Sequence, residues 1–268
     1  MKNFIFKISL KLKRLIFFIK SLKDYIYNSF LWLFFSKEHT SFSIMLSKDS
    51  ENFLARSISN FTNLSYEEIK KIIYDCNDIE IPKQKRSIEF SDVDFATKWD
   101  YRILSIVLIK AYDITNVYEL GFNQGRTAYL INEYFAQNSN VEIFYEGIDI
   151  NKRKGAFFNY IKNNNFKNQF IDLENYLNSF KNLDKLNNSL IISTTHENKS
   201  EKALFDFFEI NGIYPKLIIS DKAGTDSDYF KFVNKNDYFI DVYPFIDKNN
   251  FIKPNFISIA VNLTKSTS

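Results

Sequence analysis

The chain has 268 residues, and its 45% of hydrophobic residues is enough for one large packed domain. A single cysteine, Cys76, excludes an intrachain disulfide and a cysteine-rich zinc site. The formal net charge of +3 is unevenly distributed, because residues 1–23 hold seven basic residues and no acidic one, whereas residues 24–268 hold 28 basic and 32 acidic residues. The mildly acidic body argues against nucleic acid as a partner.

Residues 1–36 combine lysines with a dense apolar face at roughly helical spacing. The longest uncharged run, Tyr25–Ser36, is shorter than the ~20 apolar residues of a spanning helix. Lysines interrupt the apolar region that a signal peptide needs, and no small-residue cleavage site follows. We therefore expect an amphipathic helix on an anionic membrane surface, which would make a cytoplasmic protein peripheral at the inner face of the membrane. The alternative is a helix packed on the body, or on a second subunit in a homo-oligomer.

Residues 37–95 are predicted to form a helical cap over a domain that spans 96–268. The sequence Ser65-Tyr-Glu-Glu68 is a capping box, which predicts a helix over Tyr66–Asp75. Ile69, Ile72 and Ile73 supply an apolar face for this helix.

A helix over Phe95–Tyr112 leads into an alternation of strands and helices. Strands are expected at Val117–Leu120, Glu142–Ile150, Gln169–Asp172, Ser189–Thr194, Lys216–Asp221, Tyr238–Val242 and Phe256–Asn262. Helices are expected between the first five strands, at Arg126–Gln137, Arg153–Asn163, Leu173–Asn182 and Ser200–Glu209. The alternation predicts an α/β fold with a seven-stranded, mostly parallel sheet. The last two strands have no helix pattern between them, so we expect them to form a terminal antiparallel hairpin.

Polar residues and glycines follow the first three strands at the points where each strand ends. Glu119, Gly121 and Gly125 form a turn that leads into a helix, and such a turn gathers backbone N–H groups at one point. Asp149 closes the second predicted strand and Asp172 the third. Because ligands of open α/β sheets bind beyond the carboxyl ends of the strands, we expect these residues to share one site.

These features resemble the class I S-adenosylmethionine-dependent methyltransferases over residues 99–262. The resemblance implies a Rossmann-like domain, preceded here by the N-terminal helical region. It implies that Glu119, Gly121 and Gly125 hold the methionine part of S-adenosylmethionine, that Asp149 binds the ribose, and that Asp172 contacts the adenine amine. Asn123 stands where the family has its middle glycine, and asparagine tolerates a positive φ better than most residues.

Two alternatives to a methyltransferase site stay open at this point. The glycines can simply form a strand-to-helix turn. A nicotinamide-binding turn would require the spacing Gly-x-Gly-x-x-Gly, and Gly121-Phe-Asn-Gln-Gly125 lacks it.

The fourth strand is followed by His196 and the fifth by Asp221, which are the candidate catalytic residues. The segment around His196 is similar to that of sugar and small-molecule O-methyltransferases, so His196 is predicted to act as the base that takes a hydroxyl proton. The alternative is a surface histidine. Asp221 is expected to position the acceptor, and the alternative is that it binds a divalent cation. No metal is expected, because hydroxyl residues, Ser193, Thr194 and Thr195, stand where a metal site needs carboxylates.

The sequence therefore predicts methylation of a hydroxyl on a cell-surface sugar, a glycan or another small acceptor by a bacterial-type enzyme. The rival hypothesis from another class is a non-catalytic Rossmann-like binding protein, associated with the membrane surface or with a partner protein.

Overall fold

The computed structural model describes residues 58–59, 62–80, 82, 101–122, 124–150, 156–180, 182–194, 198–220, 227–245 and 255–262. The basic helix predicted for residues 1–36 lies outside these ranges, as does most of the cap predicted for residues 37–95. Within the described ranges, no helix is both long and apolar enough to cross a bilayer.

The centre of the fold is one sheet. The strands described are β1 (Asn116–Leu120), β2 (Phe144–Asp149), β3 (Phe166–Phe170), β4 (Ser189–Ser193), β5 (Leu217–Ser220), β6 (Phe239–Phe245) and β7 (Asn255–Val261). They form a seven-stranded sheet in the order β3-β2-β1-β4-β5-β7-β6. Strands β1 to β5 are parallel, whereas β7 runs antiparallel to both β5 and β6. The predicted α/β class, the mostly parallel sheet and the terminal antiparallel pair are confirmed.

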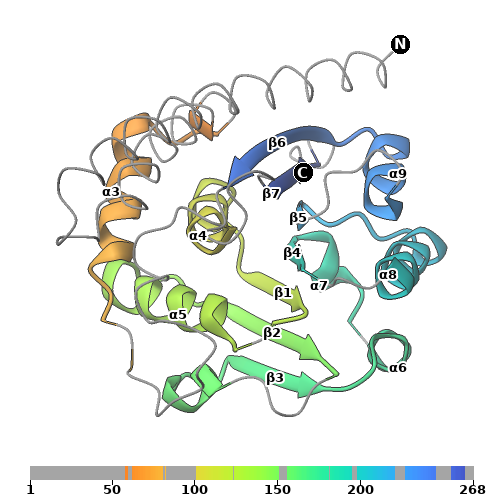
Figure 1. Ribbon diagram of the computed structural model, residues 1–268, viewed down its shortest axis with the longest axis horizontal. Helices are drawn as coiled ribbons and strands as arrows, with labels where there is room; N and C mark the ends of the chain where they lie inside the picture. The colour runs from red at the N-terminus through yellow and green to blue at the C-terminus, as the bar shows by residue number, and fades with distance from the viewer. Residues whose placement is uncertain are drawn as a thin grey trace, which may run out of the picture.

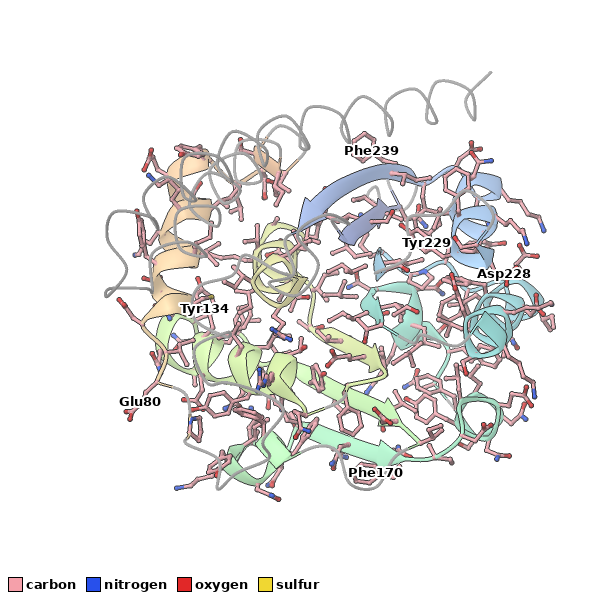
Figure 2. All side chains as sticks on the ribbon, viewed as in Figure 1. Glu80, Tyr134, Phe170, Asp228, Tyr229 and Phe239 are labelled. Atoms are coloured by element: carbon pink, nitrogen blue, oxygen red, sulfur yellow. The ribbon has the colours of Figure 1, made fainter. Side chains whose placement is uncertain are left out.

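Helices cover both faces of this sheet (Figure 1). The helical segments described are α3 (Tyr66–Asn77), α4 (Tyr101–Ala111), α5 (Arg126–Asn138), the 3₁₀ turn η2 (Ala156–Tyr160), α6 (Leu173–Ser179), α7 (Asp184–Asn187), α8 (Asn198–Asn211) and α9 (Asp228–Lys235). Helices α3, α4 and α5 lie on one side, and α6, α8 and α9 lie on the other. Tyr134 of α5 and Tyr229 of α9, labelled in Figure 2, mark the two apolar layers on opposite sides of the sheet.

The capping box at the start of α3 is confirmed. The Ser65 hydroxyl accepts from the Glu68 N–H, and the Glu68 carboxylate accepts from the Ser65 N–H at 2.7 Å. Ile69 and the other two predicted isoleucines of this helix are buried in the same apolar layer as α4 and α5. The Tyr129 hydroxyl of α5 donates to the Glu80 carbonyl just beyond α3 at 2.9 Å, which links the end of α3 to α5.

Three predicted elements between β2 and β4 are wrong in their extent. The third strand is Phe166–Phe170 rather than Gln169–Asp172, so Asp172 lies beyond the strand. The helix predicted over Arg153–Asn163 is described only as the short turn η2. The helix predicted over Leu173–Asn182 ends at Ser179, and α7 follows it.

Helix α9 was not predicted, although its local reasons are clear. The Ser227 hydroxyl accepts from the Phe230 N–H and caps its first turn. The buried Glu201 of α8 accepts from the Tyr229 N–H at 2.9 Å, so a carboxylate lies at the positive end of the α9 dipole. Aromatic side chains of α9 then pack between α8 and the sheet.

Candidate functional site

The turn between β1 and α5 is fixed by hydrogen bonds to the strands on both sides of it. The Gly121 N–H donates to the Ile148 carbonyl of β2 at 2.8 Å, and the Thr194 N–H beyond β4 donates to the Leu120 carbonyl at 3.1 Å. The Thr194 hydroxyl lies 3.1 Å from the carbonyl oxygens of both Leu120 and Gly121 and donates to this pair. The turn is thus held at the carboxyl ends of β2, β1 and β4, where open α/β sheets bind ligands.

Both glycines of the turn are required by its geometry. Gly121 and Gly125 have φ values of +83° and +79°, in the left-handed region that favours glycine. A β-carbon on Gly121 would lie 3.2 Å from the Thr194 carbonyl oxygen, and one on Gly125 would lie 2.6 Å from the Phe158 ring. Helix α5 starts directly after Gly125, so its free N–H groups open onto this turn. Asn123, the third predicted turn residue, lies outside the described ranges.

Glu119 is buried beneath the turn with 0% of its surface exposed. Its carboxylate accepts a hydrogen bond from the Thr127 hydroxyl in the first turn of α5 at 2.8 Å, and a second from the Tyr145 hydroxyl of β2. These bonds tie β1 to helix α5 and to the neighbouring strand β2. Direct contact between Glu119 and a cofactor stays a prediction; in this structure the side chain supports the turn from below.

Asp149 is the last residue of β2, as predicted, and is 6% exposed. Its carbonyl accepts from the Ile171 N–H at 3.1 Å, which brings the start of α6 beside the end of β2. Asp172 is exposed and caps α6, because one of its carboxylate oxygens accepts from the N–H groups of Glu174 and Asn175. The two predicted acids therefore follow adjacent strands, Asp149 at a strand end and Asp172 at a helix N-terminus.

An aromatic cluster packs against the turn and was not predicted from the sequence. Phe122, within the turn, contacts Phe158 of η2 and Phe170 of β3, with ring centroids 5.3 and 5.6 Å apart. Gly147 makes room for it, because a β-carbon there would lie 2.8 Å from the Phe122 ring. A glycine inside a predicted strand is the available sign of such a close approach. The Phe157 N–H also donates to the Gln124 carbonyl at 3.0 Å, so the β2–β3 connection is anchored on the turn.

The two predicted catalytic residues, His196 and Asp221, lie outside the described ranges. The strands that precede them in sequence, β4 and β5, are parallel neighbours, and their last residues, Ser193 and Ser220, are paired in register. The structure thus describes the strand ends from which both segments start, and no more.

No protein-family model and no curated protein sequence matches this chain. Solved structures do resemble it. The O-methyltransferase of Bacillus cereus in complex with S-adenosylhomocysteine is 10% identical, with 80% of this chain and 99% of that chain covered and a TM-score of 0.46. The O-methyltransferase TomG of Streptomyces achromogenes, in complex with S-adenosylmethionine, is 10% identical over 80% of this chain and 97% of that chain, with a TM-score of 0.43.

A third solved structure carries a different activity in its name. The precorrin-6y C5,15-methyltransferase of Geobacter metallireducens is 12% identical over 69% of this chain and 95% of that chain, with a TM-score of 0.41. At such identities and TM-scores these likenesses carry no argument about activity. The fold is Rossmann-like, as the strand order and the terminal antiparallel pair show.

Proposed function

We propose that this protein is an S-adenosylmethionine-dependent methyltransferase whose cofactor lies over the β1–α5 turn. One observation carries the proposal. Gly121 and Gly125 have left-handed backbone in the turn after β1, and the buried Asp149 ends the neighbouring strand β2. The turn offers close backbone approach and helix N–H groups, and the acid offers a strong acceptor for ribose hydroxyls.

Each residue of the site has a distinct proposed role. The turn Gly121–Gly125 receives the methionine part of the cofactor, and Asn123 belongs to this turn. Asp149 accepts hydrogen bonds from the two ribose hydroxyls. Asp172 receives the adenine amine with the carboxylate oxygen that helix capping leaves available. Glu119 acts through the turn it supports.

The bound cofactor would supply an electrophilic methyl group on a sulfonium centre. The protein then has two tasks: it holds the acceptor in line with the methyl–sulfur bond, and it removes the acceptor proton. Alignment is the larger contribution to the rate, since bringing two reactants into a near-attack geometry removes most of the entropic cost. We assign the proton to His196 and the positioning of the acceptor to Asp221, on the sequence alone.

For the acceptor we propose a hydroxyl of a cell-surface sugar or another small molecule. This rests on the similarity of the His196 segment to sugar O-methyltransferases and on the basic apolar segment 1–36. That segment would place the enzyme at the inner face of an anionic membrane, where envelope precursors are accessible. A homo-oligomer built through the same segment is the competing proposal.

Isothermal titration calorimetry with S-adenosylhomocysteine, S-adenosylmethionine and NAD tests the proposed function. We expect micromolar binding of both sulfur compounds, about −8 kcal/mol, and none of NAD. Tighter binding of NAD would make the protein a nicotinamide-dependent enzyme. Binding of the sulfur compounds without turnover on any envelope acceptor would favour the non-catalytic binding protein. In a turnover assay, His196→Ala is expected to lower the rate by about two to four powers of ten.

A further inference from the structure

A pocket of about 250 Å³ lies on the α6 side of the sheet, away from the glycine turn. Its lining residues come from β1, β2, β3, α6, the segment between α6 and α7, and α7: Tyr118, Phe144, Glu146, Gln169, Tyr176, Ser179, Phe180, Asn182 and Lys185. The β3–β4 connection borders the pocket. Helix α6 has seven residues and is therefore only ~10 Å long, and the chain leaves the helix at Phe180.

The floor of this pocket, which we call the Glu146 pocket, holds two buried polar groups side by side. Tyr118 and Glu146 are register partners on β1 and β2, so their side chains share one face of the sheet. They are 3% and 8% exposed. The Glu146 carboxylate accepts from the Tyr176 hydroxyl at 2.7 Å and from the Gln169 amide, one bond on each oxygen. Each carboxylate oxygen has two acceptor sites, so both retain capacity toward the pocket.

Tyr118 is the second observation that points to a ligand. Its ring is held by contacts with Phe144 and Phe180, yet its hydroxyl has no hydrogen-bond partner among the described residues. Burial, and then the charge of Glu146, raises the pKa of Tyr118 above its ordinary value. The hydroxyl therefore stays protonated at neutral pH. Because Tyr118 lines the pocket, its hydroxyl can bond to water or to a polar group of a ligand there.

The rim of the Glu146 pocket carries the opposite charge. The Lys185 ammonium lies 5.3 Å from the centre of the Phe144 ring, and no ion pair joins Lys185 to Glu146 within the described residues. The pocket thus presents a carboxylate and a hydroxyl at its floor, aromatic walls, and an ammonium at its mouth. A ligand with only an ammonium group would be attracted by Glu146 and repelled by Lys185. A ligand with only a carboxylate would be repelled by Glu146 and attracted by Lys185.

We propose that the Glu146 pocket binds a small zwitterion, an α-amino acid with an apolar or aromatic side chain. Its ammonium group contacts Glu146 and Tyr118, its carboxylate contacts Lys185, and its side chain packs between Phe144 and Phe180. The volume fits such an occupant, because drug-sized ligands fill pockets of about 300–1,000 Å³ and this one is slightly smaller.

The Glu146 pocket and the proposed cofactor site lie on opposite faces of the sheet. Glu146 precedes Asp149, the last residue of β2, by three residues, which is about 10 Å along the strand. The pocket also opens on the face that α6 covers, whereas Glu119 and the turn it supports belong to the face that α5 covers.

Calorimetry on the full chain with three matched probes tests the proposal: L-phenylalanine, 2-phenylethylamine, which lacks the carboxylate, and 3-phenylpropionate, which lacks the amine. We expect L-phenylalanine to bind more tightly than either truncated probe. If it does not bind, the other apolar L-amino acids are titrated in turn. Failure of all of them to bind at millimolar concentration overturns the proposal.

Variants then locate the binding. Glu146→Gln should weaken the zwitterion by about 10-fold to 100-fold, as expected for hydrogen bonds to a charged group. Tyr118→Phe should weaken it by about 3-fold to 10-fold. Glu142→Gln is the matched control, because Glu142 is exposed and bonded to Asn165 outside the pocket, and it should have no effect. Unchanged affinity in both pocket variants would overturn the proposal.

Two further measurements test the proposal if Glu146→Gln or Tyr118→Phe folds poorly. Lys185→Met changes an exposed rim residue, and it should narrow the difference between L-phenylalanine and 2-phenylethylamine. Equal loss of both probes in that variant would contradict the assigned orientation. S-adenosylhomocysteine should not compete with the amino acid; competition would mean that the pocket is part of the cofactor site. Cofactor binding is measured separately, so failure of either proposal leaves the other standing.

Discussion

Two buried glutamates on adjacent strands, Glu119 of β1 and Glu146 of β2, face opposite layers of the molecule. Each accepts a hydrogen bond from a tyrosine hydroxyl and another from a second side chain. Glu119 is fully covered and fastens the glycine turn, whereas Glu146 lines a pocket. The same local chemistry therefore serves as a support on one face and remains open to a ligand on the other.

The covering layer makes this difference. On the Glu119 side, the thirteen residues of α5 and the aromatic residues of η2 close over the sheet. On the Glu146 side, α6 ends after seven residues and α7 has four. Protein groups therefore surround Glu119 on every side, whereas Glu146, beside the end of α6, also borders the pocket.

The largest effect is expected from removing the two carboxylates in turn. Glu119→Ala removes the buried carboxylate that accepts from the Thr127 and Tyr145 hydroxyls and should lower the free energy of unfolding by about 3–5 kcal/mol. Glu146→Ala should cost only about 1–2 kcal/mol, because water in the pocket can replace the lost acceptor. Urea unfolding measures both; equal losses would remove the distinction between the two faces.

The next largest effect is expected at the turn that Glu119 supports. Gly125→Ala forces a β-carbon into the Phe158 ring and into left-handed backbone, for a loss of about 2–4 kcal/mol in unfolding free energy. Gly212→Ala is the control, since Gly212 has φ +64° with nothing within 4 Å of a β-carbon. It should cost only the backbone strain, about 1–2 kcal/mol. A matching loss at both positions would show that the packing around Gly125 relaxes freely.

Alkaline pH should affect both faces. Burial is the main cause that raises the pKa of Tyr134 on the α5 side and of Tyr118 and Tyr176 at the Glu146 pocket above 10.0. The unfolded chain then loses its phenol protons first, so stability is complete below pH 10 and falls above it. Each such tyrosine contributes up to about 1.4 kcal/mol per pH unit. Tyr118→Phe should flatten the fall measured by chemical denaturation; an unchanged slope would mean that Tyr118 titrates normally.

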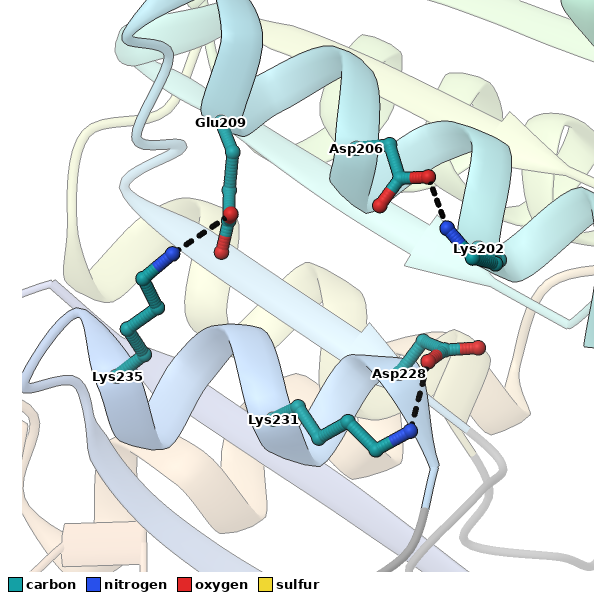
Figure 3. Close-up of polar contacts among 6 residues, drawn as sticks. All are labelled: Lys202, Asp206, Glu209, Asp228, Lys231 and Lys235. Carbon is teal, nitrogen blue, oxygen red and sulfur yellow. Dashed lines mark hydrogen bonds and ion pairs between the residues drawn. The ribbon is translucent and has the colours of Figure 1, made fainter.

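The smallest effect is expected at the surface ion pairs of α8 and α9, which involve neither Glu119 nor Glu146 (Figure 3). Lys235 lies 2.8 Å from Glu209 and joins the two helices, but both side chains are exposed to solvent. Exposed pairs are screened and contribute little. Lys235→Ala should leave the midpoint of thermal unfolding unchanged within error. A clear drop in the midpoint would contradict this expectation. It would mean that the surface ion pair, and not only the buried hydrogen bond of Glu201, holds α8 and α9 together.

Local chemistry explains which parts of the fold could be predicted from the sequence. The β1–α5 turn was predictable because its glycines interrupt an apolar strand just before a helical pattern, and Asp149 follows an equally apolar strand. Strand β3 was displaced because it is an edge strand, so Lys167 and its polar neighbours carry no apolar run. For the same reason Asp172 was predicted to end the third strand, whereas it caps helix α6.

The candidate site was predictable only as a set of strand ends. The partners of Glu119 could not be inferred, because Thr127 and Tyr145 meet it through packing between elements rather than through spacing along the chain. The Glu146 pocket depends on where α6 stops relative to β2. Phe180 lies directly after α6 and contacts Tyr118 of β1, and no pattern along the chain records this contact between distant residues.

The most direct test of the account is one calorimetric series, in which S-adenosylhomocysteine is titrated into the wild type, Asp149→Ala and Glu146→Gln. We expect micromolar binding to the wild type. Binding to Asp149→Ala should be at least about tenfold weaker, from lost charge-assisted hydrogen bonds, and binding to Glu146→Gln should be unchanged. Equal affinity in the wild type and Asp149→Ala, or a loss confined to Glu146→Gln, would contradict a cofactor site at the β1–α5 turn.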